Sequence, residues 1–393
     1  MNSKANLPSL LGFVFLVSVA QAALGDPAPC DPNHVLRSGK VWQVLPTGTD
    51  DTANLQCAFD QAVTVPGSTV LLAGGTYYTG QVAVSGFVGT FRGIGMNHTI
   101  VKTLDRTLYV TYTDFFLNPP TPESGSNPWP SILAFVGGDI VISDLSFYTT
   151  ENSWTTGWTW TGLGLTVYEL AQAFVVVGPV VSGQNYTEAN AEVYRVRVEG
   201  LPRDGTLYGY NVITGIYYEG FFGAPYGQTL PLSGKFDAHD SQFRQVGCGT
   251  CAYNLYDSRV SIARNRSTDS YEAMDIGQAV NTVYRYADNS VFNASAQGLL
   301  LWGPFDSSTL LVKDNVFTGI EGLYLDDTVT FSGDMKCGLL NNGVENMTDV
   351  GIYLGTGTKD CLVVCKASID TVKNSGTDNK LINCQAVSGN EIP

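Results

Sequence analysis

The chain has 393 residues and a formal net charge of −15 at pH 7, although only 15% of its residues are charged. An acidic chain is a poor partner for nucleic acid or an anionic membrane, and it repels an anionic polymer unless a cation bridges the two. Beyond residue 22 no stretch reaches the ~20 apolar residues of a membrane span, so we expect none.

Residues 1–22 have the pattern of a secretory signal peptide. Lys4 supplies a positive start, residues 7–20 are apolar, and Ala20-Gln21-Ala22 is a small-x-small cleavage site. We therefore expect a secreted, extracellular protein. We also expect residues 23–393 to form a single domain and the protein to be a monomer.

Eight cysteines follow this segment, an even number for an oxidising compartment, so the sequence predicts disulfides. Cys30 with Cys57 would pin the entry segment, and the last four, Cys337, Cys361, Cys365 and Cys384, would staple the final coils in a pairing that the sequence leaves open. Cys248-Gly-Thr-Cys251 also has the spacing of a zinc site, but no second close pair or neighbouring His completes a tetrahedral set. Sequons, which fit a glycoprotein, occur at Asn97, Asn185, Asn265, Asn293 and Asn346.

Residues 40–65 read as a cap on the entry to the fold. A short strand from Val41 is followed by Asp50-Asp51-Thr52 as a helix N-terminus and by a helix that presents Leu55, Ala58, Phe59 and Ala62. Strands are then expected over 70–72, 75–77, 82–84 and 87–91. A stack of coils needs such a cap because its first coil otherwise exposes an apolar cross-section.

The opening coil resembles that of the pectin-lyase-like (pectate lyase) superfamily. The resemblance lies in Gly48-Thr-Asp-Asp-Thr52, the helix after it, Gly75-Thr76-Tyr77, and Gly93-Ile94-Gly95 with Thr99-Ile100. It implies an all-β right-handed parallel β-helix with a short N-terminal capping helix, whose coils occupy about 66–385. The motif says little about activity, because hydrolases, lyases, epimerases and non-catalytic proteins share this fold.

Long insertions are expected in the first half, at 105–130, 149–162 and 200–234. The second of these contains Trp154, Trp158 and Trp160. Loops that protrude from a rigid coil often carry binding surface. The Trp cluster leaves two readings open, a binding loop or a loop packed on itself.

A repeat of 24 to 27 residues organises the second half. An Asn or small residue follows an apolar-x-apolar pair at each step, at Ser241, Asn265, Asn289, Asn315, Asn342 and Ala367. A fixed period of this kind with strand-like alternation predicts stacked coils of strands. Asn265 fills this turn position, so we discount it as a glycan site.

The strand that follows each turn predicts an outward face. If the aliphatic residues fill the interior, Tyr217, Asp275, Leu300, Tyr324 and Tyr353 point outward in successive coils, followed two residues later by Glu219, Gly277, Trp302, Asp326 and Gly355. Carboxylates beside aromatic rings suit a sugar polymer, because rings stack on sugars and carboxylates act as acid and base. We predict Asp275, Asp326 and Glu219 as catalytic residues and Tyr217, Trp302, Tyr324 and Tyr353 as substrate-binding residues, with Glu272, Asp269 and Asp306 as substitutes.

Signatures of particular activities are missing. Of the polygalacturonase-like set only Asp326-Asp327 is present, and the Asp-Pro-His-Asp/Glu pattern of uronan epimerases is absent. Asp275 and Asp326 are two coils apart, roughly 9.6 Å, at the edge of the ~6.5–9.5 Å used by inverting hydrolases. His239, Asp240, Arg244, Arg264 and Arg266 fall on or beside the turns and are expected to stabilise them.

The sequence therefore predicts an enzyme that cleaves an extracellular polysaccharide. Carboxylate-based hydrolysis is favoured over elimination, in which Tyr324 would be the base and Ca²⁺ the cofactor; otherwise no cofactor or metal is expected. The competing hypothesis is a non-catalytic glycan-binding or cell-surface β-helix.

Overall fold

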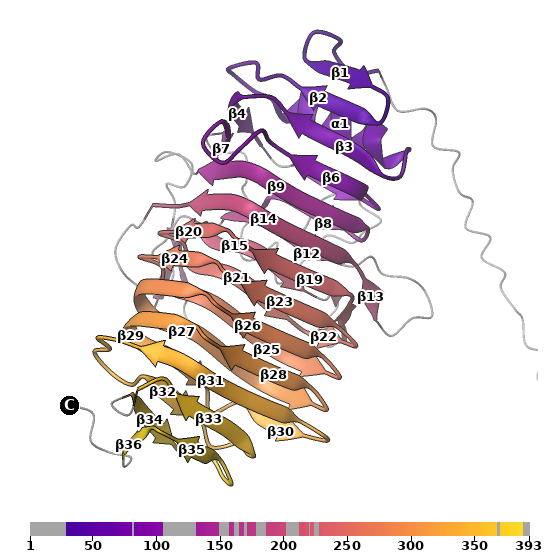
Figure 1. Ribbon diagram of the computed structural model, residues 1–393. Helices are drawn as coiled ribbons and strands as arrows, with labels where there is room; N and C mark the ends of the chain where they lie inside the picture. The colour runs from indigo at the N-terminus through magenta and orange to yellow at the C-terminus, as the bar shows by residue number, and fades with distance from the viewer. Residues whose placement is uncertain are drawn as a thin grey trace, which may run out of the picture.

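A computed structural model describes residues 29–80, 82–104, 131–148, 157–160, 165–168, 171–177, 186–201, 212–219, 221–223, 228–367 and 370–387. The predicted signal peptide, the predicted insertion at 105–130 and Trp154 lie outside these residues. Strands stack one above the next along a single axis, from the capping region at one end to the C-terminal coils at the other (Figure 1).

Three long parallel ladders form the wall of the solenoid. The first ladder consists of β5 (Val82–Ser85), β8 (Ser131–Val136), β12 (Ala171–Val177), β15 (Val212–Glu219), β21 (Cys248–Tyr253), β25 (Glu272–Val280), β27 (Ser290–Asp306), β29 (Val316–Leu325), β32 (Ile352–Leu354), β34 (Thr371–Asn374) and β36 (Gln385–Val387).

The second ladder consists of β2 (Val41–Val44), β3 (Ser68–Leu72), β6 (Val88–Arg92), β9 (Asp139–Tyr148), β14 (Asn190–Glu199), β19 (Lys235–His239), β23 (Arg259–Ala263), β26 (Val283–Ala287), β28 (Thr309–Lys313), β31 (Lys336–Val344), β33 (Cys361–Cys365) and β35 (Lys380–Ile382). The third joins β4 (Gly75–Thr79), β7 (Thr99–Thr103), β20 (Gln242–Arg244) and β24 (Arg266–Thr268) to parts of β9, β14, β27, β29 and β31.

A shorter fourth row links β13 (Thr187–Glu188), β18 (Leu232–Ser233), β22 (Leu255–Tyr256) and β30 (Thr330–Ser332) with the ends of β25 and β27. Because connections between parallel strands of one sheet are right-handed in nearly all proteins, this topology is that of a right-handed parallel β-helix. The predicted fold class is thus confirmed.

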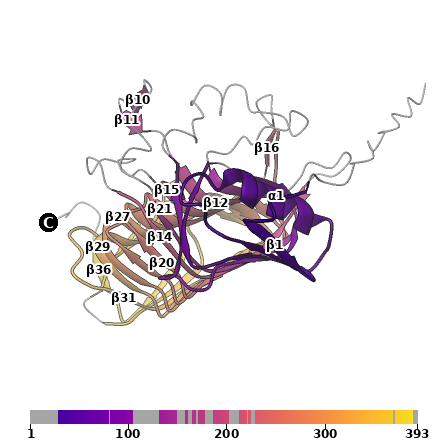
Figure 2. The same ribbon diagram turned by 90° about the horizontal axis from the view of Figure 1, so that it is seen from above.

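Antiparallel pairs flank the solenoid. β1 (Val35–Ser38) pairs with β2, β10 (Gly157–Trp160) with β11 (Leu165–Tyr168), and β16 (Phe221–Gly223) with β17 (Gln228–Leu230). Seen along the axis, the β10–β11 and β16–β17 hairpins project on the side of β12, β15 and β21 (Figure 2). Within the part of the chain that the structure describes, no helix has the length and apolarity that crossing a membrane requires.

The predicted cap is present as α1 (Thr52–Val63), whose Leu55, Ala58, Phe59 and Ala62 are all buried. The Phe59 ring lies edge-on to Phe87 at 5.4 Å, so the helix packs onto the first coil. Asp51 precedes the helix but its carboxylate accepts hydrogen bonds from the Thr47 and Tyr78 amides, which ties the helix start to β4.

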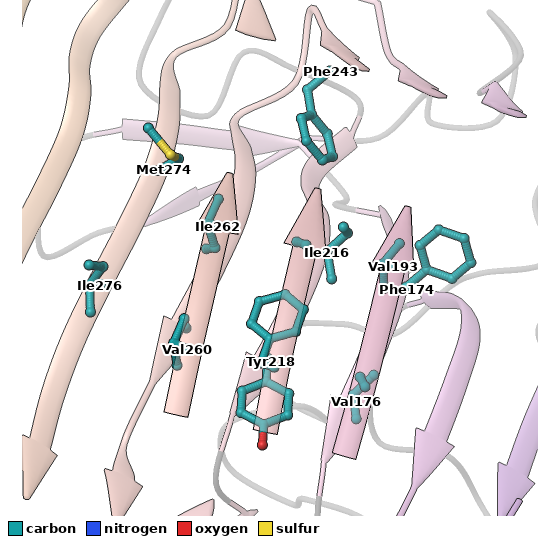
Figure 3. Packing of buried hydrophobic residues seen from close by; sticks show 14 of the residues in the cluster. Phe174, Val176, Val193, Ile216, Tyr218, Phe243, Val260, Ile262, Met274 and Ile276 are labelled. Carbon is teal, nitrogen blue, oxygen red and sulfur yellow. The ribbon is translucent and has the colours of Figure 1, made fainter. Parts of the chain in front are cut away.

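The interior is filled by the residues that the repeat places there. Ile216 and Met274 lie inside with Val193, Val260 and Ile262 of the second ladder (Figure 3). The residues that alternate with the predicted outward row are the apolar ones expected inside, and all of them are buried: Ile216, Met274, Ile276, Leu299, Leu301, Leu323, Leu325, Ile352 and Leu354. The phase of the repeat is therefore as predicted.

The Asn positions form a buried ladder between the second and third strand ladders. The Asn289 Oδ1 accepts from the Asn265 backbone amide at 3.0 Å, and its Nδ2 donates to the Ile262 carbonyl and the Asn315 Oδ1, both at 2.9 Å. Asn265 is 5% exposed, in keeping with its exclusion as a glycan site. The last bond of this ladder joins the Asn315 amide to the Asn342 Oδ1. In the next coil Cys365 is aligned with Asn342, so Ala367 does not occupy the predicted turn position.

Replacing Asn289 with alanine is expected to destabilise the fold by about 3 kcal/mol, because buried partners on both sides lose their bonds. Chemical denaturation of the variant measures the effect. The control is Asn346→Gly, which removes an exposed Asn while retaining a residue that tolerates a φ of 54°. An equal loss in both variants would contradict a special role for the ladder.

The cysteines pair as Cys30–Cys57, Cys248–Cys251, Cys337–Cys361 and Cys365–Cys384. The first ties the entry segment to α1 as predicted, and the last two hold the final coils. Cys248 and Cys251 both lie within β21, with their sulfur atoms at bonding distance.

Candidate functional site

The outward residues of the first ladder align in one row. The registers place Tyr217, Cys251, Asp275, Leu300, Tyr324, Tyr353 and Lys373 side by side on consecutive strands. The predicted order is correct except that Tyr217 and Asp275 are not neighbours. The rung of β21 lies between them, and it escaped the pattern because its Cys-Gly-Thr-Cys segment lacks the aliphatic pair that marks the other coils.

Asp275 is the centre of the site. The residue is 8% exposed, and its carboxyl accepts hydrogen bonds from the Tyr253 hydroxyl at 2.5 Å and the Trp302 Nε1 at 2.9 Å. Burial raises the pKa of Asp275 from 3.8 to about 7, while these donors and Glu272 act in the opposite direction because they favour the charged form. This carboxyl therefore titrates near neutral pH.

Two further carboxyls interact with Asp275. Glu219 is 1% exposed, and its Oε2 is buried without a hydrogen-bond partner. Burial, and then the charge of Asp275, hold the pKa of Glu219 well above its usual value. Burial and Asp275, to which it is hydrogen-bonded, likewise raise the pKa of Glu272. Glu219 and Glu272 are therefore proton carriers at pH values where ordinary glutamates are charged.

Aromatic rings surround these acids. Tyr253 is aligned with Glu219, and its ring lies 5.4 Å from the rings of both Tyr217 and Trp302. Sequence reasoning missed Tyr253 together with its rung. The signal that could have found it is the 24-residue step from Tyr253 to Gly277, which matches the step from Ser241 to Asn265.

Trp302 reaches Asp275 because the neighbouring residue is Gly277. A Cβ atom added to Gly277 would lie 2.7 Å from Cζ2 of the indole, so only glycine leaves room for the ring. The half-buried Trp302 thus orients Asp275 in addition to facing the groove.

Gly277→Ala is therefore expected to displace the indole and break its bond to Asp275. Because one donor to the charged form is lost, the pKa of Asp275 should rise above about 7. Tryptophan fluorescence against pH measures this, and Gly338→Ala is the matched control because its Cβ would meet no atom closer than 3.6 Å. An unchanged titration in Gly277→Ala would show that Trp302 does not influence Asp275.

Asp326, Tyr324 and Tyr353 lie further along the groove. Asp326 follows β29, two strands from Asp275, and its Oδ1 accepts the Thr328 amide at 2.7 Å in a turn. The ring centroids of Tyr324 and Tyr353 lie 4.6 Å apart. The Lys373 Nζ lies over the Tyr353 ring, 5.4 Å from its centroid. The predicted residues thus share one face. The charge of Asp275 raises the pKa of Glu219, whereas Asp326 is separated from Asp275 by the strand that carries Trp302.

The His239 cluster belongs to a different surface. Arg264 forms two hydrogen bonds with Asp240, and His239 contacts Asp240 and Glu192, all on the turn side of the second ladder. These contacts fit the predicted turn-stabilising role. Among the described residues, no three His, Cys, Asp or Glu side chains are grouped so as to hold a metal ion.

Comparison with solved structures finds proteins of low sequence identity to this chain. The A-module of an Azotobacter vinelandii mannuronan C-5 epimerase is 13% identical with a TM-score of 0.39, covering 86% of this chain and 94% of that one. The polygalacturonase of Erwinia carotovora ssp. carotovora is 10% identical with a TM-score of 0.37, covering 92% and 99%. No protein-family model and no curated protein matches the chain.

At these identities the likeness concerns fold only, and the fold already follows from the strand pairing described above. The parallel ladders and the capping helix give the chain the architecture of a right-handed parallel β-helix.

Proposed function

We propose that this protein is a secreted carbohydrate-active enzyme that hydrolyses an extracellular polysaccharide on the outer face of the first ladder. The observation that carries the proposal is Asp275, a carboxyl oriented by two donors and accompanied by Glu219 and Glu272. Glycoside hydrolysis needs one ionised and one protonated carboxyl on either side of the scissile bond.

The environments of these acids suggest their roles. Asp275 accepts two hydrogen bonds, which favours its ionised form as general base or nucleophile. Glu219 has no partner for one oxygen and a raised pKa, which suits a general acid that protonates the leaving oxygen. Asp326 is retained as a candidate for the acid, and Tyr217, Trp302, Tyr324 and Tyr353 as the substrate-binding surface.

Hydrolysis fits these residues better than elimination. Elimination needs a base that removes a proton next to a carboxyl group, together with a cation such as Ca²⁺. The predicted base, Tyr324, has a pKa raised to about 12 by burial, and the pKa of Tyr253 is also well above its usual value. Neither phenol is a ready base at neutral pH.

Burial supports a second candidate function. Glu219 and Asp275 are only 1% and 8% exposed. Acids that a substrate does not reach cannot act in catalysis, so this burial favours a non-catalytic glycan-binding or cell-surface β-helix.

Incubation with pectin, alginate and neutral plant glycans, with and without Ca²⁺, separates the candidates. New reducing ends without unsaturated uronates are expected from hydrolysis, whereas absorbance of unsaturated uronates would indicate elimination. Neither signal on any substrate would leave the non-catalytic function.

A further inference from the structure

Among the residues that the structure describes, the outward side chains around Asp275 include no cation. Within two strands on either side, its row consists of Tyr217, Cys251, Leu300 and Tyr324, and the row beside it of Glu219, Tyr253, Gly277 and Trp302, with Asp326 beyond. Every charged group in this set is an acid. Glu272 adds another at the start of β25.

The nearest cation in the row is distant and already engaged. Lys373 lies four strands from Asp275, roughly 19 Å along the axis. Its ammonium rests on the Tyr353 ring, and its charge acts on Asp327 and Glu321.

Basic side chains of the middle coils belong to other surfaces. Lys235, Arg259, Arg285 and Lys313 lie on the second ladder, Arg266 on the third, and Arg264 at a turn. The internal segments outside the described residues contain only two basic residues, Arg106 and Arg203.

This distribution bears on the charge of the substrate. A uronan would bring a carboxylate on each sugar into a groove whose described outward residues include no cation to pair with it. Each such carboxylate would lose water without gaining a counter-ion, and it would repel Asp275 wherever that acid is ionised. An uncharged sugar has no such penalty, because it is bound through ring contacts and hydroxyl hydrogen bonds to carboxyl groups.

We propose that the substrate is an uncharged polysaccharide rather than a uronan. This inference rests on the proposed function for its site and goes beyond it in naming the class of substrate.

The test compares neutral glucans, galactans and xylans with polygalacturonate and alginate, each with Ca²⁺ or with a chelator. Cleavage of at least one neutral glycan about 100-fold faster than of any uronan is expected. Faster cleavage of a uronan, in either condition, overturns the inference while leaving the proposed function intact.

Binding gives a readout that does not depend on turnover. Asp275→Asn protein in affinity electrophoresis should be retarded by a neutral glycan and not by a uronan. If the native protein cleaves nothing but Asp275→Asn still binds a neutral glycan, the proposed hydrolysis fails and the ligand class stands. Retardation by uronans alone, or by no glycan, overturns the inference.

A charge variant tests the cause directly. Leu300→Lys places a cation one strand from Asp275 and should increase retardation by polygalacturonate at least about tenfold. Leu311→Lys adds the same charge on the second ladder and should leave retardation unchanged. Equal effects of the two variants would show that overall charge, not the charge of the groove, excludes uronans; thermal unfolding verifies that both variants are folded.

Discussion

Asp275→Asn is expected to slow polysaccharide cleavage by about three orders of magnitude. The substitution keeps the size of the side chain but removes the group that is to accept a proton or attack the sugar, and such groups contribute about 10²–10⁴ in rate. The measurement is the initial rate of reducing-end release on the best neutral glycan, at saturating substrate, so that kcat is read separately from KM.

Two further variants locate the site. Arg264→Ala removes an exposed ion pair with Asp240 and should leave the rate within about twofold. Activity that survives Asp275→Asn but is lost in Arg264→Ala would move the site to the turn side.

Glu219→Gln and Asp326→Asn are compared to identify the acid: the larger loss in kcat is expected for Glu219→Gln, and the opposite order would assign the role to Asp326.

The thermal stability of the protein should be highest near pH 4–5 and fall as the pH rises to about 7. The pKa of Asp275 is raised from 3.8 to about 7 in the folded state, so between these values the folded state holds a proton that the unfolded state has lost. Stability therefore decreases with pH across this window. Glu219 and Glu272, whose pKa values are also raised, act in the same direction.

Below about pH 4 the opposite effect takes over. Hydrogen bonds from Arg264 lower the pKa of Asp240 from 3.8 to about 2, and those from Arg195 lower the pKa of Asp144. These carboxyls contribute stability above pH 4 that is lost as they become protonated, although their exposure keeps the contribution small.

Melting temperatures from pH 3 to 9 for native and Asp275→Asn protein check this prediction. The variant carries no titrating group at position 275, so its stability should fall less between pH 4 and 7. Parallel curves for the two proteins would mean that Asp275 is not the buried acid of the folded state.

Particular residues show which parts of the fold and the site could be predicted from the sequence. The aliphatic pairs around Asn265, Asn289 and Asn315 predict coils, interior and outward row, because strand alternation and turn geometry are local properties of the chain. The same reasoning places Asp275 beside Leu300 and Tyr324 on one face, as the registers confirm. It fails at β21, where Gly and Cys replace the aliphatic pair.

The sequence by itself determined the architecture of this protein, because a periodic pattern is repeated in every coil and one phase error would turn a whole strand inside out. Only the tertiary structure decided which acids interact. Tyr253, Asp275 and Trp302 come from three strands, and their hydrogen bonds depend on register, on the room left by Gly277 and on side-chain direction. These are relations between coils rather than within one, and burial, which sets the pKa values of Glu219 and Asp275, exists only once the coils are stacked.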